Sequence, residues 1–417
     1  MSILLAQFDA VFNILIVVTV ISLITRRFNF PQTIALIIAG IYSTVFTRFS
    51  LPYLESEIFV SILLPPILFQ ETLHRDVHEL IEDADMVLSY AVLGTLSMVI
   101  SISTFSFFVL GFGVIESLLL GIIIAPTDPV SVIGTFNSMG VVKRFQMLVT
   151  GESLFNDGVA IVIYSILMSV ATLGAITVLD IARLSVISVL GGLLLGILSG
   201  YVAHLLFCWT DDKYVEVLIS FLIAFGGFRL AEELGASGVL ATVVSGLIIN
   251  YRCKNYGGLG RQSIDMLDTL WEFVGFIAQS MAFIFIGMNT DTAVLYRYIA
   301  PVFVIVVFTL LARYIMVLVV GEILMITRDK FIPNNWTIGL TWSGLRGGVS
   351  VVLALGAASL NLHHSEEILA LTFGVVLTSN IVQGLSMSRI INLLNLSEAK
   401  IEAEAGQPDG GPSEDGV

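Results

Sequence analysis

Long apolar stretches dominate this sequence of 417 residues and constrain its fold more than any other feature. A helix of about 20 predominantly apolar residues crosses the bilayer core. Thirteen stretches of suitable length, separated by short polar segments, cover 10–25, 31–47, 56–73, 86–111, 114–135, 145–172, 180–207, 213–231, 236–251, 267–289, 297–325, 336–360 and 367–393. The sequence therefore predicts an all-α polytopic membrane protein with about 13 transmembrane helices.

The composition excludes several classes of protein. Hydrophobic residues make up 56% of the chain and charged residues 12%, whereas a soluble domain has about 25% charged residues. We therefore exclude a soluble enzyme, a disordered chain and a nucleic-acid binder, and the net charge of −14 agrees with the absence of a nucleic-acid partner. Two cysteines are too few for a disulfide framework or a zinc site. We expect no cofactor and a lipid bilayer around most of the chain.

The distribution of Lys and Arg predicts the orientation. If the N-terminus is outside, thirteen cations lie in inner loops and four in outer loops, as the positive-inside rule requires. The inner set is Arg26, Arg27, Arg75, Lys143, Arg144, Lys213, Arg252, Lys254, Arg261, Arg328, Lys330, Arg389 and Lys400, and the outer set is Arg48, Arg183, Arg229 and Arg297. We expect a multi-pass cell-membrane protein with a cytoplasmic C-terminus, and a disordered tail at 406–417 because Gly, Pro and acidic residues dominate it.

Ionisable residues inside the predicted spans are candidates for function, because a charge at the bilayer centre costs at least about 2.5–3.5 kcal/mol. The set comprises Glu71, Asp128, Glu152, Asp157, Arg313 and Arg346, with Glu272 and Glu322 nearer the span ends. Glu71 lies near the inner end of the third span. It is a candidate for a cytoplasmic funnel that attracts cations, and the alternative is an ordinary interfacial acid.

The fifth span contains two prolines, Pro126 and Pro129, on either side of Thr127 and Asp128. Each proline removes a backbone donor and clashes with the preceding turn. We expect the helix to break inside the membrane and leave free carbonyls near Asp128, which is tolerated only where the backbone is buried in protein or lines a cavity. A carboxylate beside free carbonyls suits a small hard cation. The alternative is a kinked structural helix whose Asp128 caps a half-helix.

The sixth span carries two polar pairs. Ser153 and Asp157 share one helix face, and Glu152 and Asn156 share the adjacent face. The first pair can present oxygens to a ligand, and the second can turn toward a structural partner. Two buried acids in one helix are costly unless one is paired and the other takes up a proton or a cation. The alternative is a polar contact between helices.

The twelfth span contains three glycines within Gly344–Gly348, which weaken a helix near its middle. Arg346 needs a carboxylate partner there, and we expect Glu152 to supply it. Arg313 is expected to pair with a core acid or with the carbonyl end of a half-helix. The fifth and twelfth spans are thus both interrupted, one in each half of the chain, and such a correspondence is typical of the substrate site of secondary transporters.

In combination these motifs resemble those of NhaP-type cation/proton antiporters, which are related to the eukaryotic sodium/proton exchangers. The resemblance covers most of residues 30–395 and rests on Leu64-Pro65-Pro66-Ile67, Pro126-Thr127-Asp128-Pro129, Gly151-Glu152-Ser153-Leu154-Phe155-Asn156-Asp157, Trp271-Glu272, Gln279-Ser280, Gly287, Arg313, Gly344-Leu345-Arg346-Gly347 and Val382-Gln383-Gly384. Two positions depart from the family pattern. Gln70 stands where many relatives have an acid or Asn, and Gln279 stands where Asn is common.

The resemblance implies an inverted-repeat antiporter fold with two interrupted crossing helices, usually in a homodimer. A core bundle of six helices would move against a dimerisation domain. On this basis the transmembrane antiporter domain is 1–405, with the core at 86–172 and 297–393, the dimerisation part at 1–75 and 213–289, and a linker helix at 180–207.

The resemblance also implies roles for single residues. Asp157 is the expected cation- and proton-binding carboxylate, and Asp128, Ser153 and the Thr127 carbonyl are its co-ligands for sodium. Asn156 is the first half of the Asn-Asp pair that goes with electroneutral exchange in this family. Glu152 and Arg346 would order the site, with Arg313 as a second core cation.

The expected function is secondary antiport of sodium, or lithium, against protons, without enzymatic chemistry. The cation and the proton would compete for one carboxylate site by alternating access, with one cation exchanged per proton. The alternatives are a potassium/proton antiporter of the same fold and, less favoured, a cation channel.

Overall fold

The computed structural model of the chain describes residues 2–28, 32–47, 56–73, 77–173, 177–288, 296–328, 333–358, 360 and 362–397. Helices make up nearly all of this part, and its one β contact is an isolated bridge between Val141 and Ser397. The prediction of an all-α chain is confirmed. The predicted tail at 406–417 lies outside the described residues.

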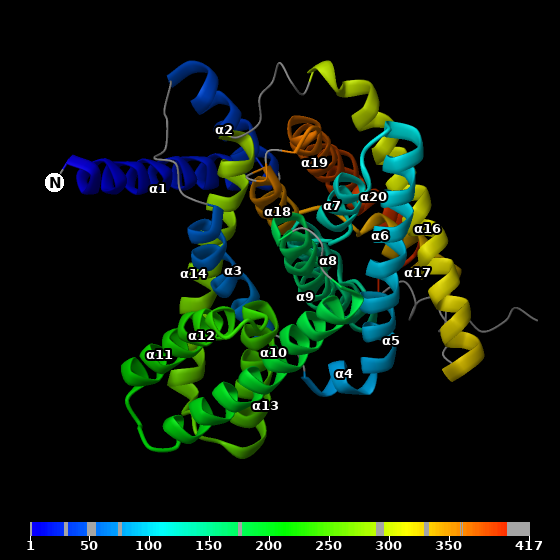
Figure 1. Cartoon of the computed structure of the whole chain (residues 1–417). Coiled ribbons are helices and arrows are strands. Elements are labelled where there is room, and N and C mark those ends of the chain that lie inside the picture. Colours follow the sequence, from blue (N-terminus) through cyan, green and yellow to red (C-terminus); the bar gives the residue numbers. More distant parts are fainter. Residues whose placement is uncertain are drawn as a thin grey trace, which may run out of the picture.

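Figure 1 shows the arrangement of the helices. In the first half of the chain they are α1 Ser2–Phe28, α2 Gln32–Thr47, α3 Ser56–Leu73, α4 Val77–Glu82, α5 Ala84–Leu88, η1 Ser89–Gly94, α6 Thr95–Phe105, η2 Ser106–Leu110, α7 Val114–Ile124, α8 Val130–Met139, α9 Lys143–Leu173 and α10 Val178–Phe207. In the second half they are α11 Lys213–Phe221, η3 Leu222–Gly226, α12 Gly227–Glu233, α13 Gly238–Tyr256, α14 Arg261–Met288, α16 Ile299–Arg328, α17 Asn334–Trp342, α18 Gly348–Ala358, α19 Ser365–Ser379, η4 Asn380–Gly384 and α20 Leu385–Leu393. The segments labelled η are π-helical turns that continue neighbouring α-helices.

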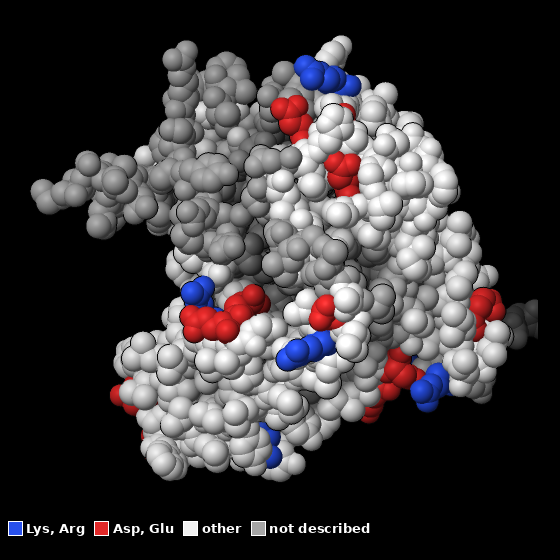
Figure 2. All heavy atoms as spheres, viewed as in Figure 1, with Lys and Arg blue, Asp and Glu red and all other residues white. Residues whose placement is uncertain are grey.

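The predicted apolar stretches coincide with helices within the described residues. In the part of the chain that the structure describes, six helical segments are long and apolar enough to cross a membrane: Ala84–Leu110, Lys143–Ala171, Ala182–Phe207, Lys213–Glu233, Ile299–Arg328 and Ser365–Leu393. Shorter apolar helices occur at Gln32–Ser43, Val114–Ile124, Gly238–Cys253 and Gly348–Ala358. Figure 2 shows few and scattered charged side chains between wide uncharged areas, as a bilayer requires. The polytopic fold is therefore confirmed, and the number of 13 crossings stays a prediction.

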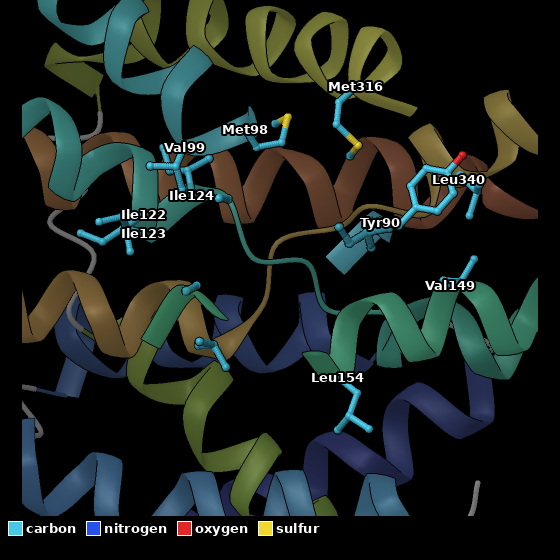
Figure 3. Packing of buried hydrophobic residues seen from close by; sticks show 14 of the residues in the cluster. Tyr90, Met98, Val99, Ile122, Ile123, Ile124, Val149, Leu154, Met316 and Leu340 are labelled. Atoms are coloured by element: carbon cyan, nitrogen blue, oxygen red, sulfur yellow. The ribbon is translucent and has the colours of Figure 1, made fainter. Parts of the chain in front are cut away.

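Both predicted helix interruptions are present. The helix α7 ends at Ile124 and α8 begins at Val130, so the two prolines lie in a non-helical connection. The helix α17 ends at Trp342 and α18 begins at Gly348, on the other side of the glycine-rich stretch. The two connections cross each other between the half-helices, as the thin teal and orange segments in Figure 3 show. The backbone N–H of Asp128 donates to the carbonyl of Leu345 at 2.8 Å, so the connections are in direct contact.

Apolar packing holds the four half-helices around this crossing. The largest hydrophobic cluster includes Ile123 of α7, Leu154 of α9, Val317 of α16 and Leu353 of α18, all buried, and part of it is drawn in Figure 3. A second cluster joins α1, α2 and α14 to α18 and α19, and a third joins α3, α10, α11, α13 and α14. The broken helices have lost backbone bonds to their own turns, and these neighbours fix their position.

Close contact between α10 and α13, which lie side by side in Figure 1, depends on small residues. Gly192, Gly196 and Gly200 recur every fourth residue along the face of α10 that touches α13. A Cβ atom added to Gly196 would lie 2.7 Å from the Cβ of Val244, too close for two carbon atoms. Small residues that let helix backbones approach are a common way to pack helices in membranes.

We expect Gly196→Ala to destabilise the protein by about 1–3 kcal/mol, because the added methyl group must push α10 and α13 apart. The measurement is the thermal unfolding midpoint in detergent. Gly134→Ala is the matched control: Gly134 also lies in a helix, yet no atom lies within 4 Å of the added Cβ. The control should leave the midpoint unchanged or raise it slightly. Equal midpoints for the two variants would contradict the packing argument.

Candidate functional site at the crossing of two broken helices

The helix α9 supplies polar side chains to the break between α7 and α8. The Ser153 hydroxyl donates to the carbonyl of Thr127, and the Asn156 amide Nδ2 donates to the Thr127 hydroxyl oxygen at 2.9 Å. All three residues are buried. The structure thus brings together three of the predicted site residues. It also shows why the broken backbone is stable, because α9 binds polar groups that the missing helical turn leaves free.

Two of the predicted acids gather at the same place. Asp157 lies one turn after Ser153 on α9 with 9% of its surface exposed, and Asp128 lies in the connection itself, partly buried. The charges of Asp128 and Glu71 both act on the Asp157 carboxyl group. The half-buried Glu71 of α3 therefore belongs to the electrostatic surroundings of the site. Acidic groups whose charges act on one another in a partly buried region favour a nearby cation.

Gly347 makes room for Asp128. A Cβ atom at Gly347 would overlap the Asp128 carboxyl group, so the two residues are in close contact. Gly347 directly precedes α18, which places Asp128 at the N-terminal end of that half-helix. A negative charge is favoured there, because the first N–H groups of a helix carry partial positive charge.

Glu152 forms a buried ion pair with Arg313. Its two carboxylate oxygens accept from Nη1 and Nη2 of Arg313 at 3.0 Å each, and the exposed fractions are 2% for Glu152 and 3% for Arg313. The Nε of Arg313 donates to the carbonyl of Leu340 at 3.1 Å, near the end of the half-helix α17. The expectation that Arg313 pairs with a core acid or a half-helix carbonyl is confirmed in both forms.

The predicted pairing of Glu152 with Arg346 is wrong. Arg313 takes this partner because Gly344 lacks a side chain: a Cβ atom at Gly344 would overlap the guanidinium group of Arg313. Arg346 instead donates from Nη1 to the carbonyl of Gly344 at 3.0 Å, and within the described residues it forms no ion pair. It is buried at the C-terminal end of α17, where the last carbonyls carry partial negative charge and favour a cation.

Three further residues hold the second break: Gln383, which the sequence indicated only as part of a family motif, and Ser379 and Asn380, which no sequence motif singled out. Asn380 donates to the carbonyl of Arg346 at 2.8 Å, Ser379 accepts from the Arg346 backbone N–H at 3.2 Å, and Gln383 donates to the carbonyl of Trp342 at 3.0 Å. They lie at or within the π-helical turn η4, a type of distortion that is frequent at functional sites. Their polar side chains in an otherwise apolar span could have indicated this role from the sequence.

The arrangement suits a small cation and a proton. The atoms that could ligate a cation are oxygens: the Thr127 carbonyl, the Ser153 hydroxyl and the carboxyl groups of Asp128 and Asp157. The side-chain oxygen of Asn156 is buried beside them without a hydrogen-bond partner. Unwound carbonyls with carboxylates at a helix crossing are the usual ligands of Na⁺ and H⁺ in secondary transporters.

Comparison with known proteins gives a consistent result. The family described as "Sodium/hydrogen exchanger, transmembrane" matches residues 14–393. The Na⁺/H⁺ antiporter NhaH of Halobacillus aidingensis is 32% identical over 91% of this chain and 96% of its own, and the Na⁺/H⁺ antiporter NhaP of Pseudomonas aeruginosa is 33% identical over 81% of each. The structure of the sodium proton antiporter MjNhaP1 from Methanocaldococcus jannaschii superposes with a TM-score of 0.79 at 19% identity, covering 95% of this chain and all of that one.

We expect Glu152→Gln to destabilise the protein by about 3–5 kcal/mol, because it leaves the Arg313 charge buried and unpaired. Thermal unfolding in detergent measures the loss. The control is Glu233→Gln, which breaks the pair of Glu233 with Arg229, both more than half exposed. That change should cost at most about 1 kcal/mol. Adding Arg313→Gln to Glu152→Gln should recover part of the lost stability. This explanation fails if the destabilisation of the double variant equals the sum of the two single destabilisations.

Proposed function

The chain belongs to the sodium/hydrogen exchanger family, and we propose that it exchanges sodium ions for protons at the crossing of α7–α8 and α17–α18. Members of this family are secondary transporters and not enzymes. The observation that carries the assignment of the site is the position of Asp157. It lies buried in the membrane-spanning helix α9, next to an unwound backbone and a second carboxyl group.

Competition for one site is sufficient for exchange. In the deprotonated state, Asp157 attracts a sodium ion, and Asp128, the Ser153 hydroxyl and the Thr127 carbonyl complete the ligand set. A proton on Asp157 removes the charge that holds the ion. If the site changes its access from one membrane face to the other only when it carries a sodium ion or a proton, the gradient of either ion can drive transport of the other.

The charge inventory of the site supports an electroneutral cycle. Glu152 is engaged by Arg313 and is not available to a transported ion. Asn156, adjacent to Asp157, adds an amide where a second carboxylate would add charge. Asp157 is then the group that alternates between a cation and a proton, with one of each per cycle.

The family resemblance supports a division of the molecule into a moving core and a dimerisation part. The core bundle at 86–172 and 297–393 contains both breaks and moves against the dimerisation part at 1–75 and 213–289, with 180–207 as a linker. We also propose a homodimer in the cell membrane, with the N-terminus outside and the C-terminus cytoplasmic. The Lys and Arg distribution of the loops supports this orientation.

Asp157→Asn should abolish exchange while the protein still inserts and folds, because an amide cannot take up the proton and has no negative charge to hold the cation. Proteoliposomes with an internal pH dye report proton movement after a sodium pulse. Asp180→Asn, on the exposed first turn of α10, is the matched control and should exchange normally. Sodium-driven proton movement retained by Asp157→Asn would remove this residue from its proposed role.

Exchange should proceed without a change in membrane potential, because one charge enters for each that leaves. A potential-sensitive dye and the pH dye are followed together in the same vesicles, with sodium, lithium and potassium added in turn. We expect a pH change with sodium and lithium and no signal from the potential dye. A potential that builds up during turnover would contradict the one-to-one ratio, and a response to potassium alone would identify a potassium/proton antiporter instead.

A further inference from the structure

An apolar cavity lies apart from the ion site, between α13 and the segment formed by α4 and α5. Its volume is about 330 Å³. One wall is formed by Leu80, Val87 and Phe155, and the other by Val244, Ile248 and Tyr251 of α13. None of the residues proposed to bind the cation or the proton lines this cavity. Its lining matches the interior of a bilayer, so a lipid chain can enter it without exposing any polar group.

Arg252, an arginine that forms no ion pair within the described residues, lies one helical turn from the cavity. Arg252 follows Ile248 by four residues and therefore lies on the same face of α13. Within the described residues its Nε is also buried without a hydrogen-bond partner. Among the described residues, the one hydrogen bond of its side chain is a long one of 3.4 Å from Nη2 to the Tyr201 hydroxyl.

Two aromatic rings fix the guanidinium group of Arg252. Its Cζ atom lies 4.8 Å from the ring centroid of Tyr201 and 4.5 Å from that of Tyr256. Tyr256 in turn packs against Tyr251, whose side chain lines the cavity, with the ring centroids 6.2 Å apart. An arginine held between aromatic rings keeps its positive charge in a fixed position, which suits a phosphate group.

We propose that this region binds one anionic phospholipid, with an acyl chain in the cavity between α4–α5 and α13 and the phosphate on Arg252. The charge of Arg252 supports the choice of occupant. An apolar cavity alone has no preference among lipids, since all of them carry similar chains, whereas an unpaired cation at the basic face of a membrane protein favours an anionic headgroup. The site lies at the end of α13 that the positive-inside rule assigns to the cytoplasm.

The test measures binding and does not depend on transport. The whole protein is purified in detergent, stripped of lipid, and titrated with phosphatidylglycerol or with phosphatidylcholine of the same acyl chains. Native mass spectrometry counts the bound lipid, and the thermal midpoint reports occupancy. We expect one tightly bound phosphatidylglycerol, about tenfold tighter than phosphatidylcholine.

Two variants separate the parts of the site. Arg252→Gln should reduce the affinity for phosphatidylglycerol about tenfold, to that of phosphatidylcholine, while Arg261→Gln, an exposed cation at the start of α14, should leave it unchanged. Ala84→Leu narrows the cavity and should weaken both lipids, while Ala182→Leu, on the exposed surface of α10, should weaken neither. Arg252→Lys keeps the charge and should retain part of the preference, and its midpoint without lipid shows whether the fold tolerates a change at this position.

Three results would overturn the proposal. The first is an unchanged preference for phosphatidylglycerol in Arg252→Gln. The second is unchanged binding in Ala84→Leu. The third is displacement of the bound lipid by glycerol phosphate at the same concentration as by phosphatidylglycerol, because the headgroup would then bind without help from the cavity.

Discussion

The structure depends on one constraint: a backbone broken inside the membrane must have every freed polar group bound by protein. The contact between the N–H of Asp128 and the carbonyl of Leu345 meets this constraint for both connections at once. Ser153 and Asn156 bind Thr127 on one side, and Asn380 and Gln383 bind the second connection on the other. The same need that stabilises the crossing therefore gathers oxygens around it.

The charges follow the ends of the half-helices. Asp128 lies at the N-terminal end of α18, and Arg313 and Arg346 both contact carbonyls at the C-terminal end of α17. Glu152 neutralises Arg313, so Asp157 is the acid of α9 that this ion pair leaves out. In this arrangement one acid on α9 forms a buried ion pair, while the proposed exchange site uses another acid five residues later. The ion pair and the exchange site can therefore be separated by mutation.

Glycines in the second connection have a different role from the one that the sequence indicated. The sequence showed that Gly344 and Gly347 weaken a helix, and the helix is indeed broken there. In the structure they also leave space for two charged groups, the guanidinium of Arg313 and the carboxyl of Asp128. A break could tolerate other residues, but a side chain at either position would displace a charged group of the site.

The sequence by itself determined the membrane class, the helical fold, both breaks and the residues of α9 that face them. These follow from local rules: span length, the missing donor of proline, the weak helix propensity of glycine and the four-residue repeat of a helix face. Only the tertiary structure decided that Arg313, and not Arg346, pairs with Glu152, and that Glu71 lies within the field of Asp157. These contacts join residues up to 161 positions apart in the chain. The choice between two buried arginines depends on which helix packs against α9 and on the space that a glycine leaves, and no local pattern encodes either.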